Sequence, residues 1–272
     1  MSKRSLLSRV FLALAAGAFV LAGCGTAPEK KSAALSPPGK LHPTLERKVM
    51  VGYQGWFRTP GDGSDLGWTH YRQNRTKQFG PGHVGVDFWP DVSELAADEK
   101  FATPLVLADG TVAHVFSSHH PRTVERHFRW MRDYGCDGAF VQRFTNPIIF
   151  DTEPSRTRLR AADNVLGYAR AAAEQSGRSF VVMYDLSGMP AGEIARVKRD
   201  WRHLVDDLKI RASAAYQYHR GKPLVAVWGI GFNDGRAYTL EETADLVAFL
   251  KHDPVYGGNT VMLGIPTRWR EQ

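Results

Sequence analysis

Cysteine is nearly absent from this 272-residue chain, which contains two cysteines, Cys24 and Cys136. A scaffold held by several disulfides is therefore excluded. Cys136 lies in the apolar setting "DYGCDGAFV" and is expected to be a small buried hydrophobic residue. Without disulfides, the chain must be stabilised by a hydrophobic core. Residues 43–272 are long enough to build one as a single domain.

Clusters of positive charge are missing from the body of the chain, although the formal net charge is +7. Residues 1–42 contain six basic residues against the single acid Glu29, so only +2 of this charge falls on residues 43–272. No basic helix and no run of Lys and Arg occurs there. Nucleic acid is therefore not expected as a partner.

Motifs for phosphate, nucleophilic and metal chemistry are also missing. No expected strand is followed by a glycine-rich phosphate loop, and no G-x-S-x-G sequence surrounds a serine. His119 and His120 are adjacent, so on an extended chain they point in opposite directions and cannot easily share an ion. The sequence therefore predicts neither a bound metal nor a cofactor.

The amino-terminal segment has the pattern of a secretory signal. Basic residues precede an apolar stretch, residues 10–21, that is too short to span a membrane comfortably. Residues 21–24, "LAGC", resemble the lipobox of bacterial lipoproteins. This resemblance implies a signal peptide at residues 1–23 and a lipid on Cys24. We therefore expect an exported lipoprotein that is anchored to a bacterial membrane by the lipid on Cys24.

Residues 24–42 are rich in proline, serine and lysine and poor in apolar side chains. This composition is typical of a flexible tether between a lipid anchor and a folded body. Gly25, rather than an aspartate, follows the cysteine and favours the outer membrane if the organism has one. The folded domain is expected to begin near residue 43.

Short apolar runs alternate with amphipathic helical patterns through the body of the chain. Strands are predicted at residues 49–53, 84–88, 139–144, 180–184, 224–228 and 260–264. Helices are predicted at residues 123–134, 157–175, 193–208 and 240–250. Thr239 and Glu242 form a capping-box pattern before the last helix, and Asp109-Gly110 predicts a hairpin turn.

This alternation predicts an α/β protein with a mainly parallel sheet and helices outside it. A doubly wound open sheet is the first alternative, but it would call for a phosphate loop that the sequence lacks. A (β/α)8 TIM-barrel-like fold accounts better for the pattern. About six of the eight βα units of such a barrel are present, so the barrel is expected to be incomplete.

Functional groups of a barrel gather at the carboxyl ends of its strands. The candidate sugar-binding residues at these ends are Tyr53, Gln54, Trp56, Trp68, Trp89, Gln142, Arg143, Tyr184 and Trp228. Sugar rings pack their C–H faces on aromatic rings, while their hydroxyls pair with amides, carboxylates and guanidinium groups. The pattern therefore predicts a poly- or oligosaccharide as partner.

Aromatic side chains can equally fill a core. We assign Phe57, Phe88, Phe144 and Trp201 to the core on their sequence context. Trp56, Trp68 and Trp89 are flanked by glycine, aspartate or proline and are expected in an open cleft.

Four segments carry a resemblance to a known family. "VMVGYQGWF", "GDGSDLGWTHY", "VDFWPD" and "HFRWMRDYGCDGAFVQRF" resemble bacterial proteins of the glycoside hydrolase family 71/99-like group. Some members are described as xylosidases or arabinosidases, and the group is related to endo-α-mannosidases. The resemblance implies a (β/α)8 barrel that hydrolyses O-glycosidic bonds. It also implies that Tyr53 and Trp89, with Tyr184 as a companion, contribute to the glycone pocket.

The late pair of glutamates that the family 99 pattern carries is missing from this sequence. Either the chain is a member truncated at its carboxyl end, or a different acid/base set is formed by Asp87, Asp185 or Asp234. Asp87 and Asp185 are the fallback catalytic candidates, though each of the three could instead cap a helix or bond a neighbouring loop. A non-catalytic glycan-binding surface lipoprotein is the alternative function. An incomplete barrel would also leave strand edges unpaired, which favours self-association.

Overall fold

The computed structural model describes residues 39–264, 266 and 270. Its central sheet contains five parallel strands, in the order β1 (Met50–Tyr53), β4 (Gly138–Phe144), β5 (Ser179–Asp185), β7 (Lys222–Trp228) and β8 (Thr260–Leu263). A short antiparallel strand, β6 (Tyr218–His219), pairs with β7. Each parallel strand pairs with the next parallel strand along the chain. This winding is that of a (β/α) barrel, because a doubly wound sheet reverses its strand order.

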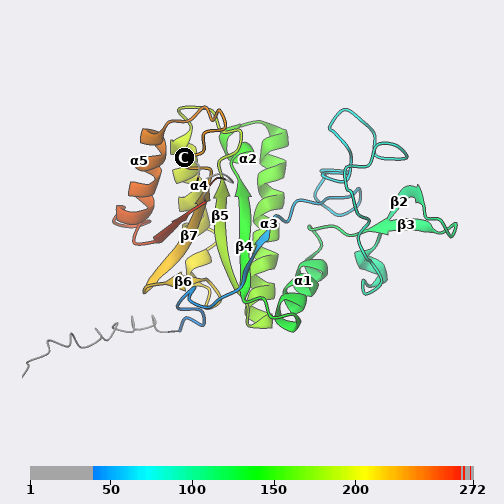
Figure 1. Cartoon of the computed structure of the whole chain (residues 1–272), viewed down its shortest axis with the longest axis horizontal. Coiled ribbons are helices and arrows are strands. Elements are labelled where there is room, and N and C mark those ends of the chain that lie inside the picture. The colour runs from blue at the N-terminus through cyan, green and yellow to red at the C-terminus, as the bar shows by residue number, and fades with distance from the viewer. Residues whose placement is uncertain (1–38, 265, 267–269, 271–272) are drawn as a thin grey trace, which may run out of the picture. The chain divides into compact units, whose positions relative to one another are not determined.

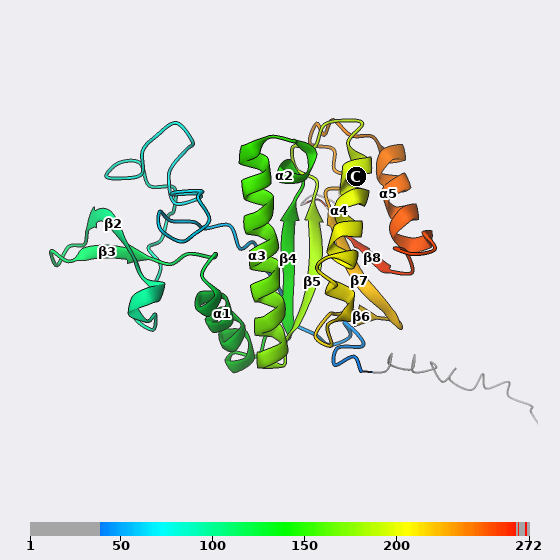
Figure 2. The same cartoon turned by 180° about the vertical axis from the view of Figure 1, so that it is seen from behind.

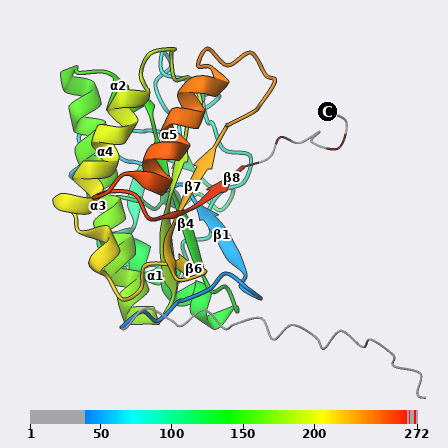
Figure 3. The ribbon, with the colours of Figure 1, turned by 90° about the vertical axis from the view of Figure 1, so that its left-hand side faces the viewer.

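The helices of the body are α1 (Pro121–Asp133), α2 (Asn146–Ile149), α3 (Glu153–Ser176), α4 (Ile194–Asp206) and α5 (Leu240–His252). Two 3₁₀ turns, η1 (Ala97–Glu99) and η2 (Ile210–Ala212), complete the helical elements. Helices α3, α4 and α5 cover one face of the sheet (Figures 1 and 2). Seen from the side, the helices form one layer and the strands another (Figure 3). The α/β class is therefore confirmed, and β1 and β8 end a row that does not close into a full barrel within the described residues.

The predicted helices are confirmed to within a few residues. The capping box before α5 is present, since Thr239 Oγ1 accepts a hydrogen bond from the Glu242 amide at 3.2 Å and Glu242 Oε2 accepts one from the Thr239 amide at 2.8 Å. Across residues 39–264, no helix combines the length and the apolar character needed to cross a bilayer.

The strand predicted at residues 84–88 is wrong. This segment is irregular apart from one isolated bridge between Arg72 and Val84. Gly85 approaches the Arg72 carbonyl so closely that a Cβ there would collide with it, which explains the glycine. Phe88 is 90% exposed, so its assignment to the core is also wrong. The predicted hairpin is confirmed as β2 (Phe101–Val106) and β3 (Val112–Val115), which pair antiparallel.

Two separate hydrophobic cores support the fold. The first core lies between the sheet and the helices and includes the fully buried Trp201. Cys136 packs against this core but is only half-buried. The second core is smaller and consists of Tyr71, Phe79 and Val115, with Phe57, Trp68 and Trp89 among the partly buried rings packed on it.

Alternation along the strands decides which side chains face the helices. Arg143 on β4 is buried on the helix side, while Gln142 and Phe144 are partly exposed on the opposite side. Parallel register pairs Phe144 with Asp185 and Asp185 with Trp228. These three side chains therefore share the face that is turned away from α3, α4 and α5.

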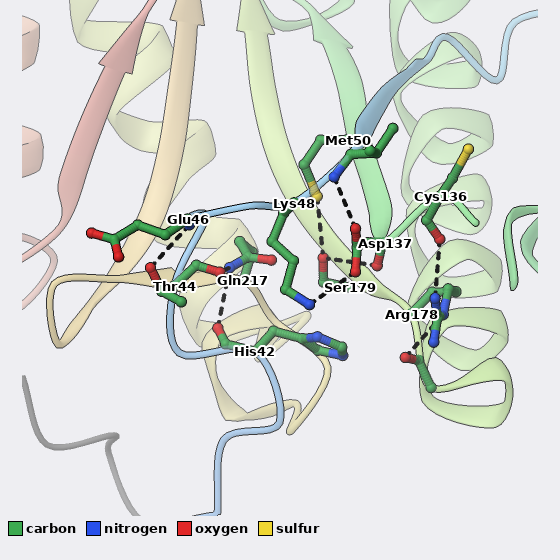
Figure 4. A network of polar contacts seen from close by, with 12 residues as sticks. His42, Thr44, Glu46, Lys48, Met50, Cys136, Asp137, Arg178, Ser179 and Gln217 are labelled. Carbon is green, nitrogen blue, oxygen red and sulfur yellow. Dashed lines mark hydrogen bonds and ion pairs between the residues drawn. The ribbon is translucent and has the colours of Figure 1, made fainter. Parts of the chain in front are cut away.

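The amino ends of the strands are tied together by polar contacts (Figure 4). Asp137 accepts hydrogen bonds from Lys48 Nζ and from the Val49 amide, both at 2.8 Å. Gln217 Nε2 donates to the carbonyl oxygens of His42 at 3.2 Å and Thr44 at 2.9 Å. These contacts fix the entry into β1 at the end of the sheet opposite the carboxyl ends of the strands.

The contact between α1 and β1 predicts a pH dependence of stability. Tyr53 Oη lies 3.0 Å from His127 Nδ1, and burial lowers the pKa of His127 to about 4. The unfolded chain then binds a proton at His127 below about pH 6.5, whereas the folded chain binds it only near pH 4. Between these values, acidification should lower the free energy of unfolding through this group. We expect a loss of about 2 kcal/mol, which is less than the full pKa shift would give, because His127 is partly exposed.

Chemical denaturation at several pH values measures this contribution. The loss of stability between pH 6.5 and 4 should be smaller in His127→Gln than in the wild type. His252→Gln, which changes an exposed histidine at the end of α5, serves as the control. An identical pH slope in wild type and His127→Gln would contradict the assignment.

Candidate functional site

A cavity of about 350 Å³ lies at the carboxyl ends of β1 and β4, beside α2 and α3. Its polar and aromatic lining residues are Gln54, Trp56, Arg58, Thr69, His70, Arg75, Gln142, Arg143, Phe144, Asn146, Arg158 and Ser187. The remaining lining comes from small and apolar residues of the same elements. In a (β/α) barrel this end of the sheet carries the functional groups, so the cavity is the candidate site.

Three stacked rings form one wall of the cavity. The Trp56 indole stacks on His70 with ring centroids 4.0 Å apart and on Phe144 with centroids 5.3 Å apart. We call these three rings the aromatic stack. Phe144, which the sequence assigned to the core, belongs instead to the cavity lining, because the alternation of β4 turns it away from the helices.

A glycine positions this wall. Gly55 has φ of +57°, which L side chains rarely adopt, and a Cβ there would lie 2.7 Å from Val165 Cγ1 on α3. The chain therefore turns sharply after β1, where Gly55 lies against α3 and the next residue, Trp56, lines the cavity.

One carboxylate lies beside the cavity without lining it. Asp185 is 5% exposed and accepts a hydrogen bond from Gln142 Nε2 and one from the Ser187 amide at 2.8 Å. Both partners line the cavity. Asp185 therefore orients the Gln142 amide and the loop after β5. It is the fallback catalytic candidate that lies beside the cavity.

A buried charge network supports the floor of the cavity. Arg143 donates to Asp200 through Nε at 3.0 Å and through Nη2 at 2.5 Å, and to Asp163 through Nη1 at 2.6 Å. Tyr184 Oη donates to Asp200 at 2.7 Å. Burial opposes the charged form of Arg143, but Asp200 and Asp163 overcome this effect and raise its pKa. The network joins β4 and β5 to α3 and α4.

A second depression of about 460 Å³ adjoins the first. It is lined by residues 187–190 and 234–238, and Ser187 lines both depressions. Arg236 pairs with Asp234 at 2.8 Å and lies over the Trp228 ring, 5.0 Å from its centroid. The two depressions therefore follow the carboxyl edge of the sheet from β1 to β7.

The structure divides the sequence-predicted site residues into groups. Gln54, Trp56, Gln142 and Arg143 line the cavity. Trp68 and Trp89 pack on the second core, and Asp87 is exposed on the irregular segment before η1.

The three residues of the expected glycone pocket do not meet. Tyr53 and Tyr184 are buried in the first core, where Tyr53 contacts His127 and Tyr184 contacts Asp200. Trp89 packs on the second core, and its Nε1 donates to the His114 carbonyl at 2.9 Å.

Several lining residues were not predicted from the sequence. Arg58, His70 and Arg75 come from the loop after β1, Asn146 from α2 and Arg158 from α3. Arg158 stands on the polar face of an amphipathic helix, where its spacing does not distinguish it from a solvated charge. Among the described residues, no three His, Cys, Asp or Glu side chains gather as a metal site would require.

Comparisons with known proteins identify no family for this sequence. No protein-family model matches it, and no curated protein was found to match. Two solved structures of the GH99 endo-α-mannosidase from Bacteroides thetaiotaomicron share 12% and 16% sequence identity with it, with TM-scores of 0.48 and 0.45. The first of these contains Bis-Tris propane. Each covers 79% of this chain, and the chain spans 51% and 55% of their length, respectively.

The charge network predicts the effect of losing its central cation. Arg143→Met leaves Asp200 buried without its partner, which should lower the free energy of unfolding by about 3–5 kcal/mol. Guanidinium chloride denaturation measures the loss. Adding Asp200→Asn removes the uncompensated charge and should restore part of the stability.

Arg160→Met is the matched control on α3. Arg160 is exposed, so this change should alter stability by about 0.5 kcal/mol or less. Equal effects of Arg143→Met and Arg160→Met would show that the network does not stabilise the fold.

Proposed function

We propose that the protein binds a saccharide in the cavity at the carboxyl ends of β1 and β4. The observation that carries this proposal is that the aromatic stack and three amide side chains line the same cavity. Trp56 and its two neighbouring rings offer apolar surface for the C–H faces of a sugar. Gln54, Gln142 and Asn146 line the same cavity and supply donors and acceptors for hydroxyl groups. The resemblance of four sequence segments to the glycoside hydrolase 71/99-like group supports the same class of ligand.

Binding without turnover is the form of this function that the geometry supports best. Hydrolysis of a glycosidic bond uses two carboxyl groups, one on each side of the bond. None of the described residues that line the cavity is an Asp or Glu. Asp185, the nearest candidate, is already engaged by Gln142 and the Ser187 amide.

Hydrolysis of O-glycosidic bonds is the second candidate. Asp185 favours it, because this carboxylate lies where the two depressions meet at Ser187. Its partner in such a reaction would have to come from outside the lining residues. Release of the aglycone from aryl glycosides, or of reducing ends from plant and fungal glycans, would establish this candidate.

Substitution within the aromatic stack tests saccharide binding. Trp56→Ala and Phe144→Ala should each reduce retention on immobilised glycans about tenfold, because a stacking ring contributes on the order of 1 kcal/mol or more. A glycan pull-down with neutral and acidic polysaccharides, combined with thermal melting, measures both binding and folding.

Trp130→Ala provides the control for this experiment. Trp130 lies on α1, bonds Glu94 and does not line the cavity. Trp130→Ala should bind as the wild type does, and undiminished binding in Trp56→Ala and Phe144→Ala would refute the proposed location.

We also propose that the protein is an exported lipoprotein held at the membrane by Cys24. Cys24 and residues 1–38 lie outside the described residues, so this proposal is supported by the sequence alone. Cys24→Ser should move the protein from the membrane fraction to the soluble or secreted fraction and abolish incorporation of labelled fatty acid. Cys136→Ser should change neither, and membrane retention of Cys24→Ser would refute the proposal.

A further inference from the structure

The cavity is unusual in the sign of its charged lining. Four arginines line it, Arg58, Arg75, Arg143 and Arg158, and no described lining residue is an acid. Arg143 is neutralised by Asp163 and Asp200. The other three make no ion pair with any described residue. By contrast, four arginines of α3 and α4 each pair with a glutamate nearby in the sequence: Arg156, Arg160, Arg170 and Arg196. Arg75 and Arg158 therefore have no described carboxylate within ion-pair distance, whereas Asp62 partly offsets the charge of Arg58 and Asp185 lies beside the cavity.

Arg58 is the buried member of this group. It is 4% exposed, and its Nη1 donates to the carbonyl oxygens of Gly55 at 2.8 Å and Phe57 at 3.0 Å. Its Nε is buried and has no hydrogen-bond partner among the described residues. Burial lowers the pKa of Arg58 to about 10, and Asp62 offsets this effect only in part. A buried guanidinium thus keeps an unused donor beside the cavity.

Arg75 and Arg158 stand at the exposed rim. Arg75 comes from the loop after β1 and Arg158 from α3, so the fold brings together two cations that are distant in the sequence. Burial lowers the pKa of Arg158, and repulsion from Arg75 and Arg72 lowers it further. Their proximity costs free energy in the empty cavity, and an anion between them would recover that cost.

His70 experiences the same positive field. Burial lowers its pKa, and Arg58 and Arg75 add to the effect. The His70 ring therefore stays neutral near pH 7 and remains a stacking partner of Trp56. The cations thus border the aromatic stack, and a ligand that lies against the stack can reach them.

We propose that Arg58, Arg75 and Arg158 form a subsite for an anionic group of the saccharide, either the carboxylate of a uronic acid or a sulfate ester. The inference rests on the proposed function and specifies the substrate class of the same site. A guanidinium presents parallel N–H donors that match the paired oxygens of a carboxylate or a sulfate. The sugar ring that bears the anionic group would lie against the aromatic stack, and neighbouring hydroxyls would meet Gln54 and Asn146.

A glycan array tests the subsite. The array carries neutral oligosaccharides together with their matched uronate and sulfated counterparts, and the probe is the labelled full-length mature protein. The wild type should retain acidic members at least about tenfold better than their neutral counterparts, and the preference should weaken as NaCl is raised. Retention of uronates alone identifies the carboxylate, and retention of sulfated sugars alone identifies the ester. Either result supports the subsite.

Variants locate the preference on the protein. Arg75→Gln and Arg158→Gln should each weaken the retention of acidic members more than that of neutral members, so that the preference for acidic members falls about tenfold. Arg160→Gln is the matched control, because it removes an exposed arginine two residues further along α3 that pairs with Glu153. An undiminished acidic preference in Arg75→Gln and Arg158→Gln would overturn the assignment to these residues.

The remaining outcomes separate this inference from the proposed function. Equal retention of neutral and acidic members would overturn the anionic subsite and leave saccharide binding intact. Retention of no saccharide at all would overturn the proposed function and the subsite together. Inorganic sulfate that competes as strongly as sulfated sugars would overturn the part of the inference that places the sugar ring on the aromatic stack.

Discussion

The candidate site depends on one buried cation. Arg143 projects from β4 between two helices and holds a carboxylate from each, Asp163 on α3 and Asp200 on α4. Removing three charges from water is costly, and only close, bidentate pairing with further hydrogen bonds compensates that cost. The geometry of β4, α3 and α4 is therefore constrained at the level of the cavity floor. The position of α3 in turn sets where Arg158 and Val165 meet the loop after β1.

Alternation along the strands explains why neighbouring residues have unlike roles. Gln142, Arg143 and Phe144 are consecutive, yet the middle one is fixed among helices while its neighbours face the other way. Asp185 and Tyr184 divide in the same manner on β5. A single shift of register would exchange the two sets and place the charge network on the open side.

Much of the architecture could be read from the sequence, because buried parallel strands and amphipathic helices have strong patterns. The apolar runs of β4, β5 and β7 and the stripe that includes Val197 and Trp201 on α4 are examples. Residues 84–88 were wrongly predicted as a strand because their apolar residues follow a strand pattern. In the structure, Gly85 instead allows the backbone to lie close to the Arg72 carbonyl. Trp56 could be predicted from its setting among glycines.

The cations could not be predicted, since Arg75 and Arg158 belong to a loop and to a polar helix face. Only the fold brings them together. Their significance comes from the distribution of neutralising partners and not from net charge. Most described ion pairs lie on the helices or at the amino ends of the strands, and Arg236 pairs with Asp234 in the second depression. Arg75 and Arg158 at the mouth of the cavity form no ion pair with a described residue.

The two sides of the cavity are supported by hydrophobic cores of different size. Its floor and one side belong to the large core through β4 and α3, but Arg58, Leu66, Thr69, His70 and Arg75 lie in the segment that packs on the small core of Tyr71, Phe79 and Val115. Small clusters open more readily than large ones, so this segment is the part of the site that can melt while the sheet persists. A ligand that contacts both sides would then stabilise the segment on the small core against the sheet and α3. Its observed affinity would be lower by the free energy needed to order that segment.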